Sequence, residues 1–243
     1  LTGKITGPDV LGAKTSGVIE GAFFGTADED INTFRLRHAF LKLDWKNSSL
    51  LIGQYWHPMF ITKSFPAVVS FNTGAPFQPF SRNPQIRFVQ KAGPVEFTLA
   101  ALSQIDFRTT GPNGSSTKYL RDAGLPEGYL GIAIHAGDHL FGAGGGYKII
   151  RPYIQYDFDD DPLTLNSFVI DETLGSFEAM GYARFNFEDF AAKVEGVYGQ
   201  NLYNLTMLGG YASYMPDPEK QELTYSPYNT LSLWGELMYG KDV

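Results

Sequence analysis

The sequence predicts an all-β protein of the antiparallel transmembrane β-barrel class, with short turns on one rim and long loops on the other. Three observations lead to this prediction. Aromatic residues make up 15% of the 243 residues, and 27 glycines and 14 prolines divide the chain, which is typical of many strands joined by turns. Runs of alternating apolar and polar residues recur along the chain, and the connections between them are alternately short and long.

The alternating runs predict about eleven strands, because successive side chains of a strand point to opposite faces. The expected strands cover residues 1–6, 15–25, 33–45, 49–56, 85–91, 95–104, 128–136, 140–150, 174–186, 189–199 and 229–239. Bacterial barrels close with an even number of strands. At about 22 residues per strand, a closed barrel of about 16 strands needs roughly 350 residues. We therefore expect residues 1–243 to be a single barrel domain within a longer chain.

The lengths of the connections are the most informative pattern. Short turns are expected at residues 46–48, 92–94, 137–139 and 187–188, and long loops at residues 57–84, 105–127, 151–173 and 200–228. A soluble sandwich has no reason to place all its long loops at one end, whereas an outer-membrane barrel does. The first long loop is rich in proline and apolar residues. We favour a constriction inside the barrel or a subunit contact for it over a free, exposed loop.

Composition excludes several classes of protein. Lys and Arg number 19 against 26 Asp and Glu, which gives a net charge of −7 and argues against a nucleic-acid binder. The chain has no cysteine, so disulfide frameworks, thiolate zinc sites and thiol catalysis are excluded. The four histidines form no HExxH motif and no GxSxG motif occurs, so we expect no enzyme, metal or cofactor. A barrel enzyme remains the weakest alternative.

An acidic run stands in the third long loop. It consists of Asp157, Asp159, Asp160 and Asp161, with Asp171 and Glu172 nearby. Oxygen-rich clusters suit Ca²⁺, but the spacing lacks the EF-hand pattern. We favour a solvated acidic loop and leave calcium open.

Two arginines of one expected strand are candidates for the pore wall. Arg35 and Arg37 alternate with Phe34 and Leu36. Because Arg on the lipid face costs about 2–4 kcal/mol at mid-depth, both guanidiniums should point inward. The apolar parity changes after Arg37, which predicts a β-bulge near residues 37–38.

Further charged residues share the inward parity or lie on loops that could fold inward. The full set of expected pore-lining residues is Arg35, Arg37, Arg82, Arg87, Glu96, Glu178, Arg184, Lys193 and Glu195. Arg87 alternates with Ile86 and Phe88 and is expected to join Arg35 and Arg37 in an anion-attracting constriction. Mixed signs on neighbouring strands allow either a solute-sorting field or a structural cross-strand ladder, and both readings stay open.

Three stretches resemble a known family. Residues 34–60 read FRLRHAFLKLDWKNSSLLIGQYWHPMF, which resembles a hairpin of bacterial outer-membrane porins of the DcaP-like and phosphate-selective group. Residues 70–88 and 194–212 resemble porin homologues from the Bacteroidetes. The resemblance covers most of the chain and implies a homotrimeric, 16-stranded porin of the bacterial outer membrane. Such a porin passes small hydrophilic solutes by diffusion, and anions are the solutes that the arginines favour.

Two contact surfaces follow from the barrel prediction. The expected lipid-facing residues are Phe97, Leu99, Phe177, Ala179, Ala183, Ala192, Val194 and Leu233. The glycine-rich run at residues 140–150 leaves little bulk, so we expect it or a neighbouring strand at a subunit interface. The main alternative is a soluble β-sandwich that binds carbohydrate, in which these apolar residues would pack between two sheets.

Overall fold

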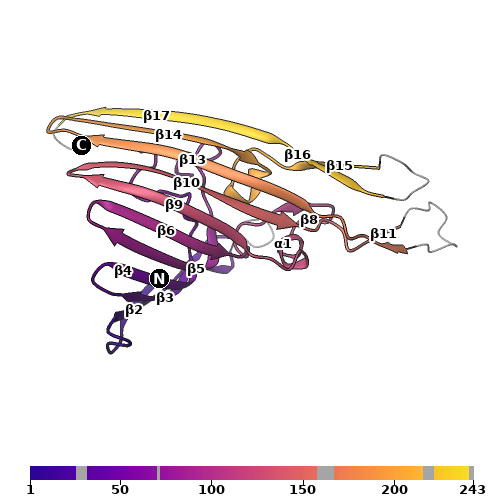
Figure 1. Ribbon diagram of the computed structural model, residues 1–243, viewed down its shortest axis with the longest axis horizontal. Coiled ribbons are helices and arrows are strands. Elements are labelled where there is room, and N and C mark those ends of the chain that lie inside the picture. The colour runs from indigo at the N-terminus through magenta and orange to yellow at the C-terminus, as the bar shows by residue number, and fades with distance from the viewer. Residues whose placement is uncertain (26–31, 70–71, 158–166, 216–221, 241–243) are drawn as a thin grey trace.

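One antiparallel sheet of eleven strands dominates the computed structural model, which describes residues 1–25, 32–69, 72–157, 167–215 and 222–240 (Figure 1). Its strands, in spatial order, are β1 (Thr2–Thr6), β2 (Lys14–Phe23), β3 (Phe34–Asp44), β4 (Ser48–Trp56), β5 (Arg82–Ala92), β6 (Val95–Leu102), β9 (Glu127–Ala136), β10 (His139–Ile150), β13 (Leu174–Asn186), β14 (Phe190–Gln200) and β17 (Asn229–Tyr239). The spatial order follows the chain. The predicted all-β class and the count of about eleven strands are confirmed, and β1 and β17 are the two edges of the sheet, which the described residues do not join into a barrel.

Smaller elements occupy the long connections. They are the two-stranded pairs β7 (Thr110–Gly111) with β8 (Gly114–Ser115), β11 (Gln155–Asp157) with β12 (Ser167–Val169), and β15 (Tyr211–Tyr214) with β16 (Thr224–Pro227), the helix α1 (Lys118–Asp122) and a 3₁₀ turn (Leu202–Leu205). Figure 1 shows β11, β15 and β16 extending past one end of the large sheet. In the described part of the chain, no helix combines the length and apolarity needed to cross a membrane.

The short turns join β3 to β4, β5 to β6, β9 to β10 and β13 to β14. Because these strands are antiparallel neighbours, the turns share one end of the sheet, which lies at the left in Figure 1. The long connections leave from the opposite end. We call these the turn end and the loop end.

The outer face of the sheet is apolar and uncovered. Leu99 is 59% exposed and Leu233 is 69% exposed, and Phe97 and Val194 are exposed beside them. The other four residues expected to face lipid share this face, where Ala179 is exposed and Phe177, Ala183 and Ala192 are half-buried. In the described residues no second sheet packs on this face, as a β-sandwich would require.

The inner face carries the core. Residues 57–81, the connection between β4 and β5, lie across this face and are called the inserted segment below; residues 70 and 71 are not described. The segment reaches the far edge of the sheet, where Ser232 donates from Oγ to the Phe77 carbonyl at 2.8 Å and Trp234 donates from Nε1 to Gln78 Oε1 at 2.9 Å. The main buried cluster joins the sheet to the inserted segment and the 3₁₀ turn through Met59, Ala100, Leu102, Tyr129, Met180, Val197, Leu202, Leu205 and Met207.

The predicted bulge in β3 is present. Glu20 of β2 pairs with His38, whereas the next residue, Gly21, pairs with Leu36. Arg37 is therefore the extra residue, and it reverses the parity of the strand as the sequence pattern indicated. On the other side of β3, Gly53 has a φ of 129°, and a Cβ there would lie 2.2 Å from the Ala39 carbonyl oxygen. This close approach explains a glycine inside an otherwise bulky strand.

The glycines of β10 serve the inner face. A Cβ on Gly142 would meet the Tyr182 ring, one on Gly144 would lie 2.1 Å from Tyr129 Oη, and one on Gly146 would lie 2.9 Å from Glu178 Oε1. The missing bulk of this run predicted a subunit interface, but these three glycines do not lie on the outer face, where such an interface would form. They make room for large side chains on the inner face.

Candidate functional site: an arginine-lined cavity above the inserted segment

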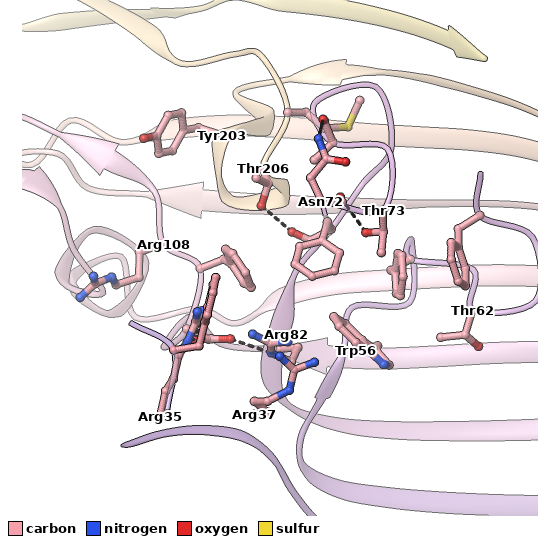
Figure 2. Close-up of a pocket in the computed structure, with 18 of the residues that line it drawn as sticks. Arg35, Arg37, Trp56, Thr62, Asn72, Thr73, Arg82, Arg108, Tyr203 and Thr206 are labelled. Carbon is pink, nitrogen blue, oxygen red and sulfur yellow. Dashed lines mark hydrogen bonds and ion pairs between the residues drawn. The ribbon is translucent and has the colours of Figure 1, made fainter. Parts of the chain in front are cut away.

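A cavity of about 1170 Å³ lies at the loop end of the inner face. The inserted segment, the start of β3, the start of β5 and the connection after β6 bound it (Figure 2). Four guanidiniums, of Arg35, Arg37, Arg82 and Arg108, line it with one carboxylate, Asp106, among the described residues. The surplus of fixed positive charge in a partly enclosed space attracts anions.

Asp106 bridges two of these arginines. The Arg82 guanidinium, whose side chain is 2% exposed, donates from Nε to Asp106 Oδ2 at 2.7 Å, and Arg35 bonds to the other carboxylate oxygen. The Phe107 ring lies beside both cations, with its centroid 5.1 Å from Arg35 Cζ and 5.4 Å from Arg82 Cζ. Figure 2 shows Arg82 beside Trp56, with Arg37 close to Arg82 and Arg35 on the other side of it. Charge-assisted bonds and ring contacts therefore fix two guanidiniums at the cavity wall.

Arg37 is paired within the wall itself. It donates from Nε to Glu20 Oε1 at 2.7 Å, and the other oxygen of Glu20 lies 3.2 Å from His38 Nδ1. This is the cross-strand pairing that the sequence left open as a structural ladder. In the cavity wall, Arg82 Nη1 and Arg108 Nε are buried donors that have no hydrogen-bond acceptor among the described residues.

Arg87 does not join the other arginines. It lines a second cavity of about 140 Å³ on the other side of the inserted segment, together with Glu96. Its Nε donates to Gln85 Oε1 at 2.7 Å, and its Nη2 donates to the Trp56 carbonyl. The expectation of one cluster of Arg35, Arg37 and Arg87 is therefore wrong. Strand parity predicts which face of the sheet a side chain lies on, but not which cavity on that face it lines.

Arg184 and Lys193 hold the inserted segment. Arg184 donates from Nη1 to the Lys63 carbonyl at 2.8 Å, and Lys193 donates from Nζ to the Phe65 carbonyl at 3.2 Å. The two cations are cross-strand partners of like sign, so they do not form the expected ladder with each other. Lys193 also pairs with Glu236 Oε2 at 2.8 Å. Glu195 is buried on the same inner face, in the ladder between Tyr182 and Trp234.

Glu178 belongs to a buried polar cluster that the sequence pattern did not predict. His57 and Glu127 join at 2.6 Å between Nε2 and Oε1, and Glu178 Oε1 lies 3.7 Å from the same His57 nitrogen. Lys148 donates from Nζ to Asn204 Oδ1 at 2.7 Å and lies 3.7 Å from Glu178 Oε2. The cluster ties the start of the inserted segment and the 3₁₀ turn to β9, β10 and β13. One feature of the sequence indicated this cluster: Lys148 is a charged residue between Tyr147 and Ile149, and a lysine in such a position needs a polar partner if it is buried.

The ligand atoms of His57, Glu127 and Glu178 all lie within 4.8 Å of one another, which is close enough for a metal ion. The hydrogen bonds argue for a polar anchor instead. The Met59 N–H donates to His57 Nδ1 at 3.2 Å, so the imidazole proton is on Nε2, the nitrogen that faces the two carboxylates. A protonated nitrogen cannot ligate a metal, and the Lys148 ammonium already lies beside Glu178.

Most of the acidic run in the third long loop falls on residues 158–166, outside the described residues.

Comparisons with known proteins support the fold. No protein-family model matches the chain, and no curated protein sequence does. The structure is similar to the outer membrane channel DcaP of Acinetobacter baumannii, with a TM-score of 0.70 and 20% sequence identity over 97% of this chain and 60% of that one. It is also similar to a loop L8 deletion mutant of OmpT, an outer membrane protein of Vibrio cholerae, with a TM-score of 0.53, 12% identity, and coverage of 82% and 60%. This chain therefore spans about 60% of the length of each.

Proposed function

We propose that the chain forms part of the wall of a bacterial outer-membrane porin that passes small hydrophilic solutes by diffusion and attracts anions. The observation that carries the proposal is the inserted segment, which crosses the inner face beneath a cavity lined by four arginines and one aspartate among the described residues. A polar lumen narrowed by a folded-in loop sorts solutes by size and charge. The apolar, uncovered outer face suits lipid.

The proposal includes a closed barrel of about 16 strands and a homotrimer. The free edges at β1 and β17 support closure by further strands, because open sheet edges do not occur within the hydrocarbon of a bilayer. Of the expected pore-lining residues, Arg35, Arg37 and Arg82 are assigned to the main cavity, and Arg87 and Glu96 to the second one. We assign Glu178, Arg184, Lys193 and Glu195 to the support of the inserted segment.

The test is electrophysiology of the native protein in a planar bilayer. Arg35→Ala/Arg37→Ala removes two cations from the cavity, so the reversal potential in a salt gradient should move toward cation preference. The matched control is Lys118→Ala/Arg121→Ala, which removes two cations from the exposed surface of α1 and should leave the reversal potential unchanged. If neither pair moves it, the arginines are wall structure and not a filter.

A further inference from the structure

The cavity already holds a carboxylate in the place where an anion would bind. Asp106 contacts Arg82 and Arg35 through different oxygens, and the aromatic ring of the next residue lies against both guanidiniums. A carboxylate bridging two guanidiniums uses the same bonds that a dissolved carboxylate would make.

The chain on either side of Asp106 is anchored by bonds that do not involve Asp106. Residues 105–108 form a short tip between two anchored residues. Gln104 is buried and its Oε1 accepts from the Thr109 N–H at 2.9 Å, which closes the base of the tip. The chain before it is bonded to β5, where Ser103 donates to the Pro84 carbonyl at 2.8 Å. Moving the tip therefore leaves the strands β5 and β6 in place.

The arginine side of the contact is built to receive an anion. Arg82 is buried and held by its aromatic neighbours, with its Cζ 5.0 Å from the Trp56 ring centroid. Its Nη1 has no acceptor among the described residues, so a donor remains after Asp106 has bound. A buried donor of this kind gains more from an acceptor than an exposed one.

We propose that Asp106 is a built-in competitor, whose carboxylate fills an oxyanion subsite between Arg35 and Arg82 and is displaced by a carboxylate solute. The proposal rests on the proposed channel and adds a residue that sets its selectivity. In the parent protein the three side chains carry a net charge of +1, and replacing Asp106 by Asn raises it to +2. Asp106 thus weakens the binding of anions, and a weakly held solute can leave the channel again.

The test compares acetate binding to the parent protein and to Asp106→Asn at constant ionic strength. Trp56 lines the cavity, so its fluorescence in detergent reports binding independently of conduction; the Trp56→Phe variant provides the background signal. We expect the half-saturating acetate concentration to fall about tenfold in Asp106→Asn, which corresponds to about 1.4 kcal/mol. In bilayers, the same variant should shift the reversal potential toward anion preference.

Asp44→Asn is the matched control, because Asp44 pairs with Lys42 at 2.7 Å at the turn end of β3, far along the strand from Arg35. It should leave acetate binding unchanged. A second variant, Phe107→Leu, keeps the carboxylate but removes the ring that lies beside both guanidiniums. Asp106 is then held less tightly and competes less well, so acetate should bind a few-fold more tightly. This variant tests the inference even if Asp106→Asn does not fold.

The outcomes are distinct. Unchanged or weaker acetate binding in both variants overturns the inference, since Asp106 would then be a fixed counter-ion that positions the arginines. If the parent protein conducts but neither variant changes acetate binding, the inference fails and the proposed function stands. Absence of conductance in the parent protein defeats the proposed function, while the fluorescence titration still decides whether the subsite exists.

Discussion

Small residues on one strand make room for tyrosines on its neighbours. Gly144 of β10 lies against the Tyr129 hydroxyl, and Gly142 lies against the Tyr182 ring. Both tyrosines are on the inner face and help to fill the space between the sheet and the inserted segment. A side chain larger than hydrogen at either glycine would occupy the volume of a tyrosine ring. The small residues at 142–146 are therefore explained by packing on the inner face.

Gly144→Ala should therefore destabilise the protein by about 1–3 kcal/mol, through overpacking against Tyr129. Tyr129→Leu vacates the space, so Gly144→Ala should cost less in the Tyr129→Leu background than in the parent. Urea titration of unfolding in lipid vesicles measures the coupling. Gly181→Ala is the control, because a Cβ there meets nothing within 4 Å. Additive costs of the two changes would contradict this packing.

At the scale of elements, side chains of β14 and β17 hold the inserted segment in position across the inner face. Glu236 of β17 accepts from the Ala67 N–H at 2.9 Å with one oxygen and binds Lys193 with the other. Lys193 in turn bonds to the Phe65 carbonyl. One ion pair therefore holds two backbone groups of the segment, one on each side of Pro66, so a single substitution should loosen both.

Lys193→Met removes the bonds from Lys193 to the Phe65 carbonyl and to Glu236, which accepts from the Ala67 amide. A hydrogen bond to a charged group contributes about 1.5 kcal/mol, so the exchange rate of the Ala67 amide hydrogen should rise roughly tenfold. In the proposed channel, single-channel conductance should rise as well, since the segment is then less tightly held across the inner face. Lys91→Met serves as control, because Lys91 is exposed near the turn between β5 and β6. Ala67 exchange that stays at the parent rate would show that the ion pair does not hold the segment.

The strands were predictable because alternation is a local property. Residues 174–186 and 229–239 form strands with the predicted bounds, and the bulge at Arg37 followed from the change of parity. The candidate site was predictable only in part. Parity placed Arg35 on the inner face, but the Asp106 bridge depends on how a long loop folds back. No local pattern specifies a contact between residues 71 positions apart.

At the scale of the whole molecule, the two faces of the sheet have opposite character. The outer face presents Leu99 between Phe88 and Leu130 of the neighbouring strands, and all three are exposed. The inner face buries charged residues under loops. This is the reverse of the distribution in a soluble protein, and it suits an apolar medium around the sheet.

Leu99→Arg should accordingly destabilise the protein in lipid vesicles by about 2–4 kcal/mol, because the guanidinium would sit at mid-depth. The control is Leu11→Arg, in the connection between β1 and β2, where Leu11 is 85% exposed at the turn end of the sheet. There we expect at most about 1 kcal/mol. Chemical denaturation in vesicles compares them, and equal costs would place Leu99 outside the bilayer.

The path of the inserted segment has a consequence for the order of folding. Its contacts with β17 join residues 155 to 169 positions apart. Residues 57–81 are synthesised well before β17, the strand that binds them. Contacts of such long range close slowly, because the entropy of a large loop is lost before they form. Insertion of the segment should thus be a late step of assembly, and the proposed channel would be widest in the intermediate that precedes it.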